Sequence, residues 1–155
     1  MICYQILTPE HKTDILEFES QYAPGLPVYY RHSPDSLNSY IFKNKDGRAY
    51  GAFDGETLVG WAGYSLRKKG EYEMCGMIVH PGFRRRGIGL KLFQLRLDDL
   101  LKKPGAKSIS ATCYPANSPI IILYLTNGFV IYNFKKDYFG PGVDRLFLRY
   151  QPQKS

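Results

Sequence analysis

The segment 71–103 constrains the fold of this chain more than any other. Its apolar first part, 71–79, predicts a buried strand, and the run 87–103 predicts a helix because its apolar residues recur at helical spacing. The expected buried face of this helix contains Leu90, Phe93, Leu97, Leu100 and Leu101. A Pro/Gly turn with three consecutive arginines joins the two parts. The segment therefore predicts a strand, a basic turn and a helix in that order.

This basic turn predicts an anion-binding site. The first turn of a helix has unpaired backbone N–H groups and about half a unit of positive charge. Gly87 and Gly89 would let a ligand approach the backbone, and the arginines add forked donors for phosphate. The spacing is neither that of the lysine-bearing phosphate loop nor Gly-x-Gly-x-x-Gly. We therefore expect a phosphate or pyrophosphate ligand of another class.

The rest of the chain predicts an α/β domain built on a mixed sheet. Further strands are expected at 2–7, 48–53, 57–67, 108–114, 129–133 and 144–150, and further helices at 9–20, 36–44 and 120–127. A right-handed crossover would make 108–114 parallel to 71–79. The prediction is one domain over residues 1–150, with about seven strands and about four helices, followed by a polar tail, 151–155.

Charge and cysteine content narrow the function classes. The net charge of +7 favours an anionic ligand. The three cysteines, Cys3, Cys75 and Cys113, are isolated in apolar surroundings, which predicts reduced core thiols of a cytoplasmic protein and no metal site. The sequence predicts neither a secretory leader nor a membrane span, because no apolar run is long enough.

A second motif follows the predicted strand 108–114. It runs Asn-x-x-Ile-x-x-Leu-Tyr-x-x-Asn-Gly-Phe over residues 117–129. Together with the Arg-x-x-Gly-x-Gly turn and Val79-x-Pro81, it resembles the GCN5-related N-acetyltransferase (GNAT) family. Ile120 stands where the family usually has a small residue. The expected order of elements also resembles that of the family over nearly the whole chain, which implies the GNAT fold.

The resemblance implies acetyl-coenzyme A (acetyl-CoA) as co-substrate. In the family the pantetheine arm lies along the strand before the basic turn, and the turn amides bind the pyrophosphate. The positions that this implies here are Met77, Ile78, Val79, Arg84, Arg85, Arg86, Gly87, Ile88, Gly89 and Asn117. The three arginines need not all face phosphate. A simple helix cap is the alternative role of Asn117.

The resemblance also implies two catalytic groups for acetyl transfer to a primary amine. Glu73 lies six residues before Val79, where several histone-type members carry a general base, and Glu71 is the second candidate. Tyr124 is expected to donate a hydrogen bond to the leaving thiolate. The alternatives are two solvent-facing carboxylates at a strand end and a core tyrosine.

The acceptor is predicted from two aromatic loops. Residues 137–144 resemble a loop of protein N-terminal acetyltransferases, although Arg145 replaces the usual small residue that follows it. Tyr138 is expected to contact the acceptor, and so are Tyr29 and Tyr30 in the other loop and Glu71 on the predicted strand 71–79. A peptide α-amine, with a pKa of about 7.7–8.0, needs less help from a base than a lysine at about 10.4.

Other acceptors and other functions stay open at this point. Polyamines, amino acids and aminoglycosides are alternative acceptors, and an aminoacyl-tRNA is a minor one. A non-catalytic acyl-CoA-binding module is disfavoured because Tyr124 is present, and nucleic-acid binding rests on charge alone. The protein is expected to be a monomer or a homodimer. We interpret His11, His32 and His80 as structural.

Overall fold

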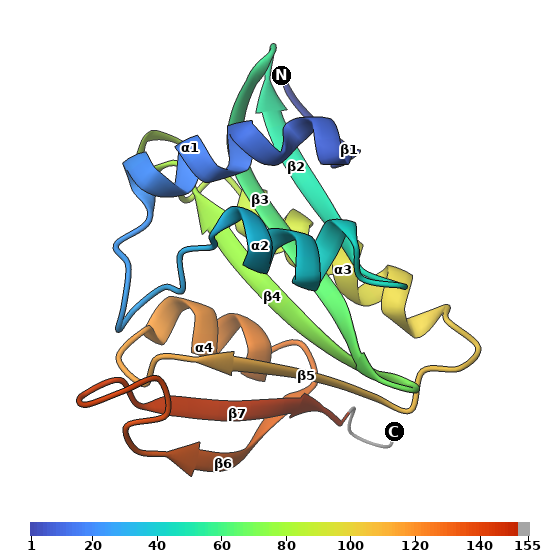
Figure 1. Ribbon diagram of the computed structural model, residues 1–155, viewed down its shortest axis with the longest axis vertical. Helices are drawn as coiled ribbons and strands as arrows, with labels where there is room; N and C mark the ends of the chain where they lie inside the picture. The colour runs from blue at the N-terminus through green and yellow to red at the C-terminus, as the bar shows by residue number, and fades with distance from the viewer. Residues whose placement is uncertain (152–155) are drawn as a thin grey trace.

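A seven-stranded mixed sheet forms the centre of the protein (Figure 1). The structure, a computed structural model, describes residues 1–151. Its strands are β1 (Ile2–Ile6), β2 (Arg48–Asp54), β3 (Thr57–Lys68), β4 (Glu71–Val79), β5 (Ser108–Cys113), β6 (Phe129–Lys135) and β7 (Arg145–Tyr150). Its helices are α1 (Lys12–Tyr22), α2 (Pro34–Leu37), α3 (Ile88–Leu101) and α4 (Ser118–Leu125), and its shorter turns are η1 (Pro9–His11), η2 (Asn38–Phe42) and η3 (Pro81–Phe83).

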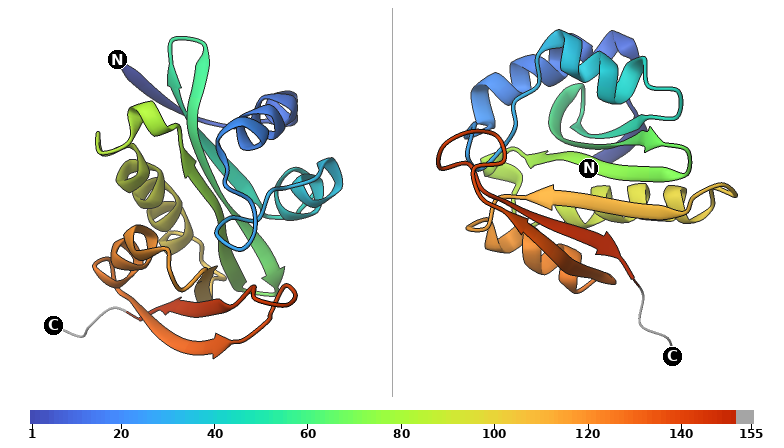
Figure 2. Two further views of the ribbon diagram at one scale, coloured as in Figure 1. Left: turned by 90° about the vertical axis from the view of Figure 1, so that its left-hand side faces the viewer. Right: turned by 60° about the horizontal axis from the view of Figure 1, so that its bottom comes forward.

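The strand order is β1-β2-β3-β4-β5-β7-β6. β4 and β5 run parallel across α3, whereas every other neighbouring pair is antiparallel. The predicted mixed sheet and the parallel crossover are therefore confirmed. Helices α1 and α2 cover one face of the sheet, and α3 and α4 cover the other (Figure 2).

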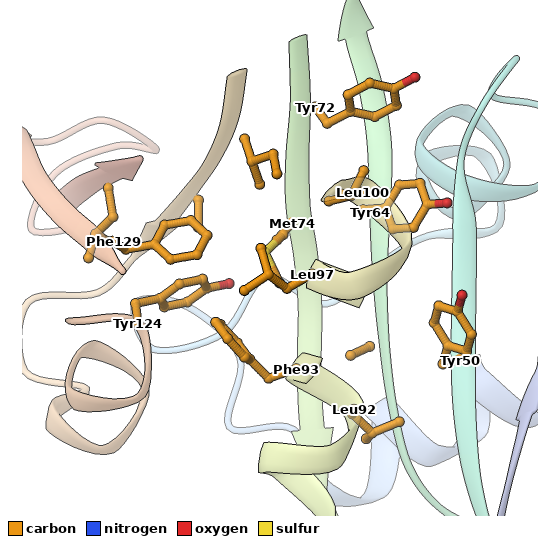
Figure 3. Close-up of a cluster of buried hydrophobic side chains, with 14 of the residues drawn as sticks. Tyr50, Tyr64, Tyr72, Met74, Leu92, Phe93, Leu97, Leu100, Tyr124 and Phe129 are labelled. Carbon is orange, nitrogen blue, oxygen red and sulfur yellow. The ribbon is translucent and has the colours of Figure 1, made fainter. Parts of the chain in front are cut away.

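Helix α3 packs its buried stripe against the sheet and α4 (Figure 3). Its buried residues are Ile88, Leu92, Phe93, Arg96, Leu97 and Leu100. The predicted face was wrong for Leu90 and Leu101, which are 43% and 50% exposed. The prediction omitted Arg96, a fully buried arginine on the stripe, because a charged residue was not expected in the core.

The pairing of β4 with β5 stops halfway along β4. The last paired residues are Met74 and Ala111, and β4 continues to Val79 without β5 beside it. The register of β3 against β4 shifts at this point, where Gly76 forms a bulge with φ +60°. Beyond Met74, β4 and β5 therefore diverge, and α4 lies beside their separated ends (Figure 1).

Several predicted boundaries differ from the structure. α4 begins at Ser118 instead of residue 120, because Pro119 is tolerated in the first turn of a helix. The expected helix 36–44 is a single α turn followed by the π-helical turn η2. Cys3 is exposed on the edge strand β1, so its predicted place in the core was wrong. Most of the predicted polar tail, residues 152–155, lies outside the described residues.

Asp99 ties the C-terminal half of α3 to the sheet. Its Oδ2 accepts hydrogen bonds from Arg48 Nη1 at 2.8 Å, from the Tyr50 hydroxyl at 2.9 Å and from the Tyr64 hydroxyl at 2.6 Å. Burial alone would raise the pKa of Asp99, but the hydrogen bonds from the two tyrosines and the charge of Arg48 outweigh it. The pKa of Asp99 therefore lies below its usual value.

Replacing Asp99 by asparagine is expected to lower the free energy of unfolding by about 1–3 kcal/mol at pH 7, because a charged acceptor of three hydrogen bonds is lost. A depressed pKa stabilises the fold above the unfolded value, about 3.9, and this contribution is lost as pH falls through the folded value. Urea unfolding at pH 7 and pH 3 measures this: the difference in the free energy of unfolding between the wild type and Asp99→Asn should be smaller at pH 3. Asp98→Asn, an exposed neighbour, is the matched control.

Candidate active site

The basic turn between β4 and α3 has the geometry of an anion-binding loop. Arg85 and Gly87 adopt positive φ angles of 63° and 79°, which turn the chain sharply into α3. Lys91 donates the first helical hydrogen bond, to the Gly87 carbonyl at 2.9 Å. The amides before Lys91 are those that a helix leaves unpaired, and they lie at its positive end.

A cavity of about 560 Å³ lies against this turn; we call it the larger cavity. Eight of the ten predicted cofactor-binding residues line it, namely Met77, Ile78, Val79, Arg84, Arg85, Ile88, Gly89 and Asn117. Arg86 and Gly87 do not. The guanidinium of Arg86 lies over the Phe83 ring at 5.0 Å, and Gly87 supplies the positive φ at the start of α3.

A smaller cavity, of about 120 Å³, adjoins the larger one. The two share Val28, Tyr29, Met77, Asn117 and Ile120. The predicted catalytic residues Glu73 and Tyr124 both line the smaller cavity, Glu73 from β4 and Tyr124 from α4. The fold thus brings Glu73 and Tyr124, which are 51 positions apart in the chain, to the same small cavity next to the basic turn.

Tyr124 presents a protonated hydroxyl to the smaller cavity. Its ring packs edge-on against Phe93 and Phe129, at centroid distances of 5.2 and 4.8 Å. Burial raises the pKa of the phenol, and the Arg96 guanidinium beside it offsets only part of the rise. At neutral pH the hydroxyl therefore keeps its proton and is able to donate a hydrogen bond.

Arg96 is a buried charged group next to Tyr124 whose position the sequence did not reveal. Its Nη1 donates to the Gly63 carbonyl at 3.0 Å and to the Gly76 carbonyl at 3.2 Å. Within residues 1–151 no carboxylate forms a salt bridge with it. Its positive charge is therefore not neutralised locally and acts on the neighbouring Tyr124 hydroxyl.

Glu73 is the carboxylate on the β4 side of the smaller cavity. Burial raises its pKa, and the charge of Arg67, whose Nε lies 3.2 Å from Glu73 Oε2, lowers it in part. A carboxylate with a raised pKa is a stronger base than an exposed one. Glu71, the second candidate, is exposed at the start of β4 and lines neither cavity.

Among the predicted acceptor-binding residues, Tyr29 and Tyr30 line the smaller cavity. Tyr138 does not, because its ring turns to Phe139 and Phe147, at 4.8 and 5.1 Å. Phe139, its neighbour in the same loop, lines the cavity instead. Which of two consecutive aromatic residues faces inward depends on the loop conformation, which no feature of the sequence indicates.

A buried carboxylate fixes the loop that carries Tyr29. Glu19 is 1% exposed and accepts hydrogen bonds from the Tyr29 hydroxyl at 2.6 Å and from the His32 amide at 2.7 Å. The Nδ1 atom of His32 lies 2.8 Å from the same carboxylate. This contact is structural, the role expected for His32, but no partner was predicted for it, and His32 also lines the smaller cavity. His11 and His80 bond to backbone amides of nearby turns.

The described residues contain neither a metal-ligand cluster nor a membrane-spanning helix. No group of three or more His, Cys, Asp or Glu side chains in residues 1–151 is arranged to hold a metal ion. In the same part of the chain, no helix is long and apolar enough to cross a membrane.

Comparison with known proteins identifies the family. Residues 12–129 match the model of the acetyltransferase (GNAT) family, and the chain therefore belongs to that family. The uncharacterized protein ML0378 of Mycobacterium leprae is 29% identical over 158 residues, which cover 95% of this chain and 40% of ML0378. The chain thus spans less than half the length of this curated relative.

Solved structures share the fold at low sequence identity. The ribosomal-protein-S18-alanine N-acetyltransferase of Escherichia coli superposes with a TM-score of 0.81 at 16% identity, covering 100% of this chain and 96% of that one. Arabidopsis thaliana NAA60 in complex with a bisubstrate analogue gives 0.80 at 16% identity, covering 100% of both chains. These similarities confirm the GNAT fold predicted from the two motifs.

Proposed function

We propose that this protein transfers the acetyl group of acetyl-CoA to a primary amine. The observation that carries the proposal is the pair of adjoining cavities, which joins a basic helix N-terminus to a chamber lined by Glu73 and Tyr124. One relative with the same fold, NAA60, has been solved in complex with acetyl-CoA. A screen of acceptor amines, monitored by release of free thiol, tests the activity directly.

The larger cavity suits the donor. The amides at the start of α3, together with Arg84 and Arg85, would bind the pyrophosphate. The pantetheine arm would lie along the end of β4, on the edge where β5 no longer pairs with it. The space around Gly89 is open to a ligand. A Cβ built at this position would have only Val79 and Met77 within 4 Å, at 3.9 and 4.0 Å. The site thus has the open cradle that a diphosphate requires.

The smaller cavity supplies the groups that the transfer needs. Glu73 accepts the proton that the amine loses as its nitrogen bonds to the acetyl carbon. The Tyr124 hydroxyl donates a hydrogen bond to the sulfur as the carbon–sulfur bond breaks, and the charge of Arg96 beside it favours the negative thiolate. The thiolate then takes a proton from Tyr124 or from water.

For the acceptor we propose a protein or peptide N-terminus, and a small amine is the alternative. One structural neighbour, the ribosomal-protein-S18-alanine N-acetyltransferase, suggests the first choice together with the aromatic loops. We further propose that residues 1–150 act as one catalytic domain, as a monomer or homodimer in the cytoplasm, where its three unpaired cysteines would stay reduced.

Gly89→Val is expected to weaken acetyl-CoA binding by at least about tenfold, because the added methyl groups enter the space proposed for the pyrophosphate. The fold should survive, since the nearest atoms leave room for a Cβ. Isothermal titration calorimetry with CoA measures the effect. Gly105→Ala, at a glycine with open space around it, is the control. Unchanged affinity in a folded Gly89→Val protein would contradict the proposed donor site.

Tyr124→Phe is expected to lower kcat by about ten- to a thousandfold, with little change in the donor KM. The ring and its packing remain, so only the hydrogen bond to the sulfur is lost. Steady-state kinetics on the amine found in the screen measures both constants. A kcat equal to that of the wild type would return Tyr124 to a purely structural role in the core.

Glu73→Gln is expected to remove the acidic limb of the kcat–pH profile. In the wild type, activity should fall as pH decreases through the pKa of Glu73, because the protonated acid cannot accept a proton, and burial shifts this limb toward higher pH. Glu71→Gln, outside both cavities, is the matched control. If Glu71→Gln changes the profile and Glu73→Gln does not, the base is misassigned.

A further inference from the structure

Arg145 is a buried arginine without an anionic partner in the described structure. It is 4% exposed at the start of β7 and lines the smaller cavity. Its Nη1 donates to the Pro27 carbonyl at 3.0 Å, and its guanidinium lies over the Phe139 ring at 5.0 Å. Its Nε is buried and has no acceptor among residues 1–151. No carboxylate in the same range lies within salt-bridge distance of it.

Burying the Arg145 guanidinium costs free energy unless an anionic group pairs with it. Removing a guanidinium from water carries a large desolvation penalty, and burial accordingly lowers the pKa of Arg145. A neutral carbonyl and an aromatic ring compensate for little of this penalty. A carboxylate in the cavity would offset this penalty through a charge-assisted hydrogen bond, for which the planar guanidinium has the right geometry.

Arg145 is the cation that is available to a ligand in the smaller cavity, because the neighbouring arginines have other partners. Arg67 pairs with Glu73, and Arg96 donates to two backbone carbonyls and does not line the cavity. Arg145 is thus the one lysine or arginine that lines the smaller cavity among the described residues. The chamber has a carboxylate on the β4 side and a guanidinium on the β7 side.

We propose that Arg145 binds a carboxylate on the acceptor, so that the preferred acceptor is an amine with a negative charge close to it. The inference rests on the acetyltransferase function proposed above and specifies its substrate class. Arg145 lines the smaller cavity and not the larger one, which places it on the acceptor side and away from the donor. The carboxylate is either the α-carboxylate of a free amino acid or the side chain of an N-terminal acidic residue.

The contacts of Arg145 orient it for this role. The hydrogen bond to Pro27 and the stacking on Phe139 attach it to the two loops that wall the cavity, and they use only one of its two terminal nitrogens among the described residues. A purely structural arginine with the same contacts would support both loops for every acceptor alike. Discrimination between charged and neutral acceptors therefore separates the two roles.

The test compares acceptors that differ in one charge. Peptides that begin with aspartate or asparagine form one pair, and glycine with glycinamide forms the other. For at least one pair, the wild type should have a kcat/KM that is about ten- to a hundredfold higher for the carboxylate than for the amide. The peptide pair reports a side-chain source, and the glycine pair reports an α-carboxylate source.

Arg145→Met should abolish this preference, through a higher KM for the acidic acceptors, and leave turnover of the amide acceptors within about threefold. Arg149→Met, an exposed arginine on the same strand, makes the same charge change and should keep the preference. Equal loss on charged and neutral acceptors, or a wild type without preference in either pair, overturns the inference. Turnover of the amide acceptors separately tests the acetyltransferase function.

Discussion

The bulge at Gly76 is the constraint on which the site depends. A side chain there would begin 2.5 Å from the ring of Trp61, which is fully buried, so the close approach of β4 to β3 requires glycine. The Gly76 carbonyl points to Arg96 and accepts a hydrogen bond from it, which satisfies a group that the bulge removes from the sheet. Because β4 bends here, its last residues separate from β5. The two cavities occupy the space that this separation opens next to α4.

Helix α3 connects the core of the sheet to the larger cavity. Near its C-terminus Asp99 is held by three side chains of β2 and β3, and at its N-terminus the amides meet the larger cavity. The middle of the helix contributes Arg96, whose charge has no carboxylate beside it in the described structure. Its positive charge makes the smaller cavity less favourable for a protonated amine. A positive environment favours the neutral form of an amine, so it would lower the pKa of the acceptor and reduce what Glu73 has to supply.

The parts of the fold that the sequence predicted are those with local signals. The basic turn and the motif at 117–129 are short, and glycine, proline and arginine have direct geometric meaning there, so eight of the expected cofactor positions line one cavity. Glu19, Arg96 and Arg145 are different, since a charged residue in a helix or strand predicts a solvated position and only the tertiary contacts reveal its burial. The same limit explains the exposed Leu90 and Leu101, whose side of α3 depends on where the helix docks.

The residues that we propose for the chemistry and those that we propose for acceptor choice lie on different parts of the molecule. Glu73 and Tyr124 lie on β4 and α4, whose positions follow from the bulge and the core. The proposed acceptor side is bounded by loops with their own anchors. Glu19 holds residues 29–32, Asp137 Oδ1 accepts a hydrogen bond from the Gly142 amide, and Asp144 Oδ1 accepts one from the Asp137 amide. Arg145 joins the two loops. A change in a loop anchor or in Arg145 would therefore alter the acceptor without displacing the reacting groups. This separation explains physically why a fold shared at 16% identity does not determine the substrate.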